Sequence, residues 1–135
     1  MSGVPLTADE IAALDSAKLA RIKAALLAYF EKQPRDVSFV ELERAVGPDA
    51  TGDCAITNDT CRELNIWWWF GVSLEFSRAV GQLLTDDLVV TRPCSLLVYA
   101  IDGRYPTHPI AQSTTRSYKK PRWLPLVFSI KRGSA

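Results

Sequence analysis

The sequence predicts an α+β fold in one domain, with three helices followed by a small antiparallel sheet. Two patterns carry this prediction. Apolar residues recur at three- and four-residue steps in three segments before residue 85, which is typical of amphipathic helices. Beyond residue 87 they gather in short runs rich in Val, Leu, Ile and Phe, which favours strands. A length of 135 residues suits a single domain, and we expect residues 1–15 to form an N-terminal extension.

Side chains that can cap helices mark the expected helix boundaries. The three helices are expected over 17–32, 38–46 and 73–84. The first ends before Pro34, because the residue that precedes a proline avoids the helical region. Ser38 opens the second helix as part of a capping box, and Gly47 with the proline after it ends that helix. Ser73 can cap the third helix.

Between the second and third helices we expect a loop and then one short strand. Residues 48–60 are rich in Asp, Gly, Thr and Asn, which favours a loop. The strand, expected to end at Gly71, carries the densest aromatic run of the chain: Trp67, Trp68, Trp69 and Phe70. Alternate residues of a strand face opposite ways, so Trp67 and Trp69 would share one face. One aromatic face would then form a partner or homodimer interface, unless the loop and the first helix bury both faces.

The last third of the sequence predicts a hairpin with a long connection. Runs of β-forming residues occupy 88–91, 96–101 and 124–130. Pro93 separates the first two runs, because proline interrupts a central strand. We expect strands at 96–101 and 124–130, joined by the long polar segment 102–123, which is called the basic loop below.

Charge is distributed unevenly along the chain, although the total is only +1. Residues 1–102 hold nine Lys or Arg and fifteen Asp or Glu, whereas residues 103–135 hold seven Lys or Arg and no acid. Such polarity indicates contact with nucleic acid or another anionic surface at the basic end. The alternative is a solvated basic segment that balances the acidic body.

The order of these elements resembles the winged helix-turn-helix class of DNA-binding domains over residues 22–130. The run Leu83-Leu84-Thr85-Asp86-Asp87-Leu88-Val89-Val90 is similar to the helix-to-strand junction of that class. The resemblance implies a role in transcription regulation, with the third helix in the major groove of DNA. The outward positions of this helix would be Glu75, Arg78 and Gln82, and Arg78 and Gln82 would contact base edges. The chain departs from the class in the 26 residues, 47–72, between the second and third helices.

The basic loop offers the stronger signal for nucleic-acid contact. Its candidate contacts are Arg104, Arg116, Tyr118, Lys119, Lys120 and Arg122. Cations in this number can neutralise phosphates and release counterions. Tyr118 and Trp123 could stack on exposed bases of single-stranded nucleic acid. Alternatively, these two aromatic side chains anchor the loop on the body of the protein.

Other function classes find less support. Cys54, Cys61 and Cys94 with His108 lack the paired spacing of a zinc site, and no nucleophile motif or phosphate-binding loop is readable. We therefore expect no catalytic activity, metal or cofactor. An odd number of cysteines, without a readable signal peptide or membrane span, leads us to expect a cytoplasmic protein. The favoured function is binding of duplex DNA, and the alternative is a protein adaptor that uses residues 66–70.

Overall fold

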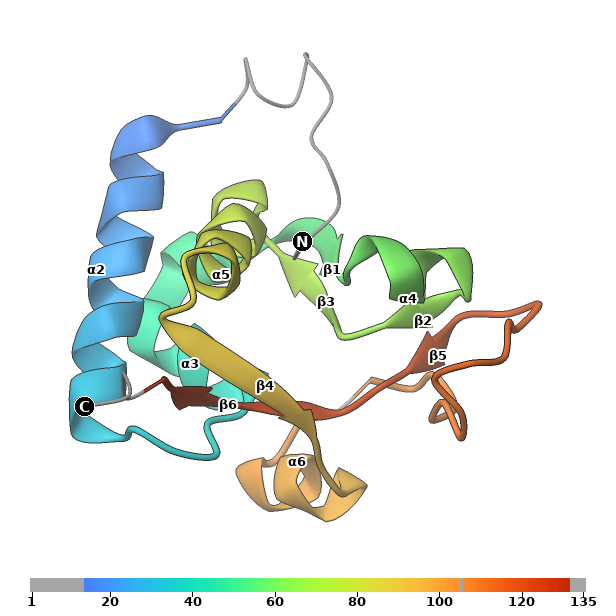
Figure 1. Cartoon of the computed structure of the whole chain (residues 1–135). Helices are drawn as coiled ribbons and strands as arrows, with labels where there is room; N and C mark the ends of the chain where they lie inside the picture. Colours follow the sequence, from blue (N-terminus) through green and yellow to red (C-terminus); the bar gives the residue numbers. More distant parts are fainter. Residues whose placement is uncertain (1–13, 105, 132–135) are drawn as a thin grey trace.

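The computed structural model describes residues 14–104 and 106–131, and it confirms an α+β fold (Figure 1). The helices are α2 (Ser16–Lys32), α3 (Phe39–Val46), the 3₁₀ turn η1 (Gly47–Ala50), α4 (Asp59–Glu63), α5 (Leu74–Thr85) and α6 (Leu96–Asp102). The strands are β1 (Thr51–Ile56), β2 (Ile66–Trp67), β3 (Trp69–Val72), β4 (Val89–Pro93), β5 (Arg122–Trp123) and β6 (Leu126–Ile130). The expected N-terminal extension, 1–15, lies outside the described residues apart from its last two.

The three helices expected from the sequence are present as α2, α3 and α5, and their caps explain where they begin. The Asp15 carboxylate accepts from the N–H of residue 18 at 3.0 Å and so caps α2. The Ser38 hydroxyl accepts from the N–H of Glu41 at 3.3 Å, and that of Ser73 accepts from the N–H of Phe76 at 3.1 Å. Each cap satisfies a backbone donor that has no partner within its own helix.

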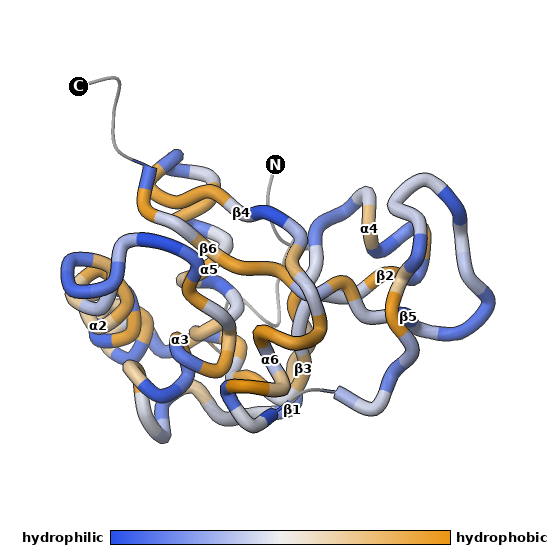
Figure 2. The backbone as a smooth tube through the Cα atoms, turned by 90° about the horizontal axis from the view of Figure 1, so that it is seen from below, coloured by the Kyte–Doolittle hydropathy of each residue, from blue (hydrophilic) through white to orange (hydrophobic). Residues whose placement is uncertain are grey.

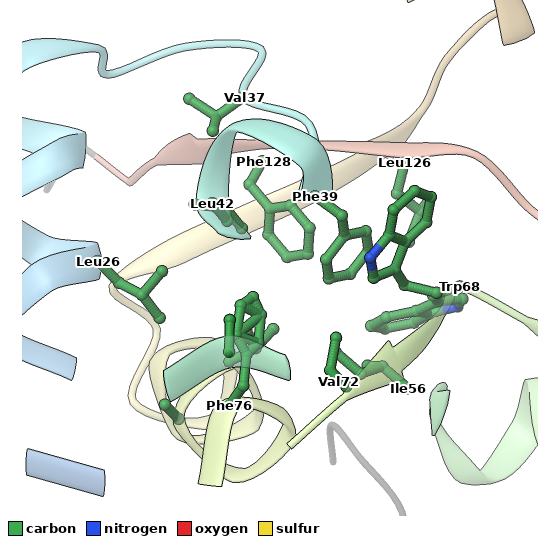
Figure 3. Packing of buried hydrophobic residues seen from close by; sticks show 14 of the residues in the cluster. Leu26, Val37, Phe39, Leu42, Ile56, Trp68, Val72, Phe76, Leu126 and Phe128 are labelled. Carbon is green, nitrogen blue, oxygen red and sulfur yellow. The ribbon is translucent and has the colours of Figure 1, made fainter. Parts of the chain in front are cut away.

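An antiparallel pair, β4–β6, runs between α5 on one side and α6 on the other (Figure 1). Val37, which lies between α2 and α3, adds a bridge to Phe128 on the free side of β6, with both backbone bonds at 2.8 Å. The side chains of Phe39 and Phe128 meet edge to face with ring centroids 4.9 Å apart (Figure 3). Phe76 of α5 closes the same core, and all three rings are at most 1% exposed.

The expected strand over 96–101 is wrong, because this segment forms α6. Ser95 caps the helix by accepting from the N–H of Leu97 at 3.1 Å. Tyr99 is fully buried, and its hydroxyl donates to the carbonyl of Leu126 at 2.6 Å. The helix turns Tyr99 into the core with Leu96 and Val98 packed against it, whereas a strand would place Leu97 and Ile101 on the same face as Tyr99. The antiparallel partner of β6 is therefore β4, the run that precedes Pro93.

The expected loop over 48–60 is also wrong, because it contains η1, β1 and the start of α4. Strand β1 pairs antiparallel with β3, with an irregular register around Cys54. Gly52 approaches β3 so closely that a Cβ atom there would lie 2.6 Å from the carbonyl oxygen of Val72. The polar segment forms a strand because β3 supplies its hydrogen-bond partners. The residues of β1 themselves give no indication of this pairing.

The aromatic run forms two short strands instead of one, and its predicted alternation is wrong. Strand β2 pairs parallel with β5, whereas β3 pairs antiparallel with β1. The change of partner falls at Trp68, whose N–H donates to the carbonyl of Ile56 at 2.8 Å. As a result the consecutive residues Trp68 and Trp69 are both buried, at 5% and 2% exposure, while Trp67 and Phe70 are half-buried. The expectation of an exposed aromatic face therefore does not hold for Trp68 and Trp69.

Candidate nucleic-acid interface

The basic loop closes on itself where its last residue, Trp123, meets residues 109–111. The N–H of Trp123 donates to the carbonyl of Pro109, and the N–H of Ala111 donates to the carbonyl of Trp123, both at 2.8 Å. Residues 112–122 therefore form a closed excursion beyond this junction. The excursion projects at the end of the molecule opposite α2, beyond β2 and β5 (Figures 1 and 2).

Asn65, immediately before β2, attaches this excursion to the body. Its side-chain amide donates to the carbonyl of Tyr118 at 3.3 Å, and its own carbonyl accepts from the N–H of Arg122 at 3.0 Å. The N–H of Tyr118 also donates to the carbonyl of Leu64 at 3.0 Å. Asn65 has a φ of 58°, a left-handed conformation that Asn tolerates better than most residues. The excursion is thus tied to the body at two points of its backbone.

Tyr118 organises the inside of the excursion. Its hydroxyl accepts from the N–H groups of Gln112 and Ser113, each at 3.1 Å. Its ring lies under two guanidinium groups, with Arg116 at 5.4 Å and Arg122 at 4.6 Å from the ring centroid. These are cation–π distances, so each of the two guanidinium groups contacts the ring of Tyr118.

Four cations gather on this excursion, and we call them the cation cluster: Arg116, Lys119, Lys120 and Arg122. The first three are exposed, and Arg122 is half-buried with its guanidinium donating to the carbonyl of Ile110 at 3.2 Å. The five ion pairs among the described residues include none of the four. Their positive charge is therefore not cancelled by a neighbouring carboxylate in the described chain.

Arg104 is one of the contacts expected from the sequence, but the structure places it elsewhere. Its guanidinium donates to a carboxylate oxygen of Glu43 on α3 at 2.8 Å. It also lies 5.4 Å from the centroid of the Trp69 ring. Arg104 thus joins the segment after α6 to the body, and it is not part of the cation cluster.

The structure separates the expected base-reading helix from the cation cluster. Helix α5 packs on α2, and the excursion projects at the other end of the molecule (Figures 1 and 2). On α5, Arg78 is exposed and Gln82 is half-buried. The structure therefore does not bring these two residues together with the cations of the basic loop.

The prediction that Glu75 points outward is wrong. The carboxylate is buried at 7% exposure, lies 3.4 Å from the Lys18 ammonium and accepts from the N–H of Asp15 at 3.0 Å. Burial acts to raise the pKa of Glu75, but the hydrogen bonds and the nearby ammonium outweigh it and hold this pKa below its usual value. Glu75 therefore joins α5 to the start of α2.

Trp123 is not available for stacking on a base. It is 1% exposed, its indole N–H donates to the carbonyl of Trp68 at 3.0 Å, and its ring meets that of Tyr99 edge to face at 5.1 Å. Trp123 instead anchors the basic loop on the body, which is the alternative that the sequence left open.

Asn65 is the functional residue that sequence reasoning missed. Its one available signal is a polar side chain inside an otherwise apolar run, 64–70.

Other chemistry finds little support in the described part of the chain. It holds no group of three or more side chains able to ligate a metal ion, and none of its helices is long and apolar enough to cross a membrane. Burial raises the pKa of Cys94 to about 11, so this thiol stays protonated at neutral pH and is a poor nucleophile. A hollow of about 510 Å³ over β4 and β6 is rimmed by cations, but Arg92 and Lys131 there pair with Asp36 and Asp87.

Comparisons of this chain with protein-family models, with curated proteins and with solved structures found no match.

Proposed function

We propose that the protein binds nucleic acid through the cation cluster, with duplex DNA as the ligand and its phosphates as the groups contacted. The observation that carries the proposal is the set of four cations on one excursion, none of them paired with a carboxylate among the described residues. Cations that neutralise phosphates release condensed counterions, and this release supplies most of the affinity that does not depend on sequence.

The way the excursion is held supports the proposal. Binding costs free energy when a mobile segment becomes ordered, so a segment already fixed in position binds more tightly. Here Asn65 and Tyr118 fix the backbone around the cations, through hydrogen bonds of 3.0 to 3.3 Å. Two of the cations, Arg116 and Arg122, are also in cation–π contact with the Tyr118 ring.

The aromatic residues of the basic loop favour a duplex over a single strand. Proteins that bind single strands stack successive bases on aromatic rings. Trp123 is buried in the core, and two guanidinium groups already lie over the ring of Tyr118. Phosphate contacts remain, and a duplex offers them at a higher density than a single strand.

We further propose that the fold is a variant of the winged helix. The order α2, Val37, α3, α5, β4 and β6 supports it, with Val37 and β4 flanking β6 in one antiparallel sheet. In this variant the wing would be the connection from β4 to β6, enlarged by α6 and the basic loop. Arg78 and Gln82 would remain the residues of α5 that reach base edges. We expect their contribution to be separable from that of the cation cluster, because α5 packs on α2 whereas the excursion projects at the end of the molecule opposite α2 (Figures 1 and 2).

The test measures binding of a fluorescent duplex of about 20 base pairs by anisotropy, in about 50 mM salt. The loop variant is Arg116→Ala/Lys119→Ala/Lys120→Ala. A matched control, Lys23→Ala/Lys32→Ala/Arg35→Ala, removes the same charge from α2 and the residues after it. We expect the loop variant to lose affinity by at least about 30-fold and the control by less than about threefold.

Three results would contradict the proposal in whole or in part. Equal losses in the two variants would mean that net charge, and not the cation cluster, governs binding. No binding by the wild-type protein at low salt would remove nucleic acid as the ligand and would favour a protein adaptor, with an acidic protein as the partner to seek. A single strand that binds more tightly than the duplex would overturn the choice of ligand but not the choice of surface.

A further inference from the structure

A cleft of about 340 Å³ lies between α3, η1 and the end of α6. Helices α3 and α6 are neighbours, and both are visible when the molecule is seen from below (Figure 2). The volume is at the lower end of the roughly 300–1,000 Å³ of ligand sites, so the cleft suits a small molecule. Gly47 and Gly103 line it without side chains, and a Cβ atom at either would meet no atom within 4 Å. Four of the lining residues are charged: Glu43, Arg44, Asp102 and Arg104.

Two of these four side chains pair with each other. The Arg104 guanidinium donates to one carboxylate oxygen of Glu43 at 2.8 Å, and the indole N–H of Trp69 donates to the other oxygen. Glu41, on the same helix as Glu43, accepts from the Tyr29 hydroxyl at 2.6 Å. The two carboxylates of α3 that lie nearest to the cleft therefore already have partners.

The other two charged side chains, Arg44 and Asp102, form no ion pair with each other or with any other residue of the described chain. The Asp102 carboxylate accepts from the Ser38 hydroxyl, and the Arg44 guanidinium donates to the main-chain carbonyl of Asp102 at 2.7 Å. A carboxylate can accept about four hydrogen bonds and a guanidinium can donate about five, so both groups keep bonding capacity. The cleft thus holds an unpaired negative charge and an unpaired positive charge close together.

We propose that this cleft binds a small zwitterion, a free α-amino acid, with its ammonium group on Asp102 and its carboxylate on Arg44. An α-amino acid carries its two charges on adjacent carbon atoms, so it can reach two opposite charges that lie close together. Guanidinium groups bind carboxylates through two parallel hydrogen bonds, and charge-assisted bonds of this kind are among the stronger ones. A ligand with only one charge would leave either Arg44 or Asp102 unmatched. Val40 and Thr51 complete the lining, so a small side chain suits the ligand.

An NMR titration of the isotope-labelled protein with L-valine, in the absence of nucleic acid, tests this proposal independently of the proposed function. Isobutylamine is L-valine without its carboxylate, and isovalerate is L-valine without its ammonium group. We expect saturable amide shifts within residues 40–51 and 102–104, with a Kd of about 1 mM or below. Each fragment should bind at least about tenfold more weakly, because it loses one charge-assisted contact.

Two variants identify the groups that the ligand contacts. Arg44→Gln and Asp102→Asn each remove one charge, but the new amide can still donate to the carbonyl of residue 102 or accept from Ser38. Arg44→Gln should bind L-valine no more tightly than isobutylamine, and Asp102→Asn should bind it no more tightly than isovalerate. The matched controls, Arg92→Gln and Asp36→Asn, change the same residue types in an exposed ion pair away from the cleft and should bind like wild type.

Several outcomes would overturn the proposal. Amide shifts that do not saturate by about 20 mM L-valine would exclude an amino-acid site of useful strength. Equal affinity of the wild-type protein for L-valine and for one of its fragments would exclude a zwitterion as the ligand, and this comparison does not depend on whether any variant folds. Shifts confined to other residues, or equal losses in the controls and in the cleft variants, would contradict binding between Arg44 and Asp102.

Discussion

The Tyr99→Phe substitution removes a single hydroxyl that joins three elements of the fold. This hydroxyl donates to the carbonyl of Leu126 in β6 at 2.6 Å and accepts from the N–H of Phe39 at 3.1 Å. Phe39 begins α3, where the N–H has no partner within the helix. Leu126 forms a non-hydrogen-bonded pair with Pro93, since the neighbouring bond runs from the N–H of Cys94 to the carbonyl of Pro125, so the carbonyl of Leu126 points away from β4. The substitution therefore leaves a buried donor and a buried acceptor without their partner.

The expected cost follows from these two groups. Each buried backbone group left unsatisfied costs about 1–3 kcal/mol, and the ring itself still fills its space, so no large cavity term is added. We expect the free energy of unfolding to fall by about 3 kcal/mol. With a urea dependence of about 1.5–2 kcal/mol per molar for a chain of this size, the midpoint should shift down by about 1.5–2 M.

Urea unfolding followed by circular dichroism measures this effect, with Tyr29→Phe as the control. The Tyr29 hydroxyl also makes a 2.6 Å hydrogen bond, to Glu41, but both residues are half-buried and water can replace it. We expect that control to lose less than about 1 kcal/mol. A loss for Tyr99→Phe no larger than that of Tyr29→Phe would refute the reasoning that Tyr99 fixes α6 to the core.

Three further predictions concern the loop attachment, a buried carboxylate and a close backbone approach. Asn65→Gly keeps the left-handed backbone accessible but removes the side-chain bond to Tyr118, so trypsin should cut the basic loop several-fold faster; an unchanged rate would contradict the attachment. Because the pKa of Glu75 is lower in the folded than in the unfolded state, its stabilisation is present above about pH 4.5 and is lost as the pH falls through the folded pKa. The wild type should thus exceed Glu75→Gln by about 1–2 kcal/mol at pH 7 and lose that advantage in acid; a difference independent of pH would be inconsistent with this. Gly52→Ala should cost about 2 kcal/mol and lower the Tm by several degrees, because the new Cβ would meet the backbone of Val72; an unchanged Tm would count against so close an approach.

The three long helices could be predicted because their signals are local. Ser38 and Ser73 lie next to the donors that they cap, and the apolar periodicity of each helix is contained in its own segment. Strand β1 could not be predicted in this way. Its residues are polar and turn-forming, and it exists because β3 pairs with it across the chain. The helical state of 96–101 likewise depends on the contacts of Tyr99 with two distant elements.

Part of the candidate site could be predicted from charge alone. The excess of cations after residue 102 is visible in the sequence and points to the basic loop. Composition does not report which cations have partners: Arg104 is paired with Glu43, while the cation cluster has no such partner in the described chain. Nor does it report burial, so the sequence suggests Trp123 and Trp69 as available surfaces although both lie in the core.

The salt dependence of duplex binding tests the central claim most directly. Each neutralised phosphate contributes about −0.9 to the slope of log affinity against log salt. Four contacts predict a slope near −3.6, which is an affinity loss of about 150-fold between about 50 and 200 mM salt. The variant Arg116→Ala/Lys119→Ala/Lys120→Ala should fall to a slope near −0.9, a loss of about 3.5-fold, while the control Lys23→Ala/Lys32→Ala/Arg35→Ala keeps the wild-type slope. A loop variant whose slope equals that of wild type would show that the cation cluster does not contact the phosphates.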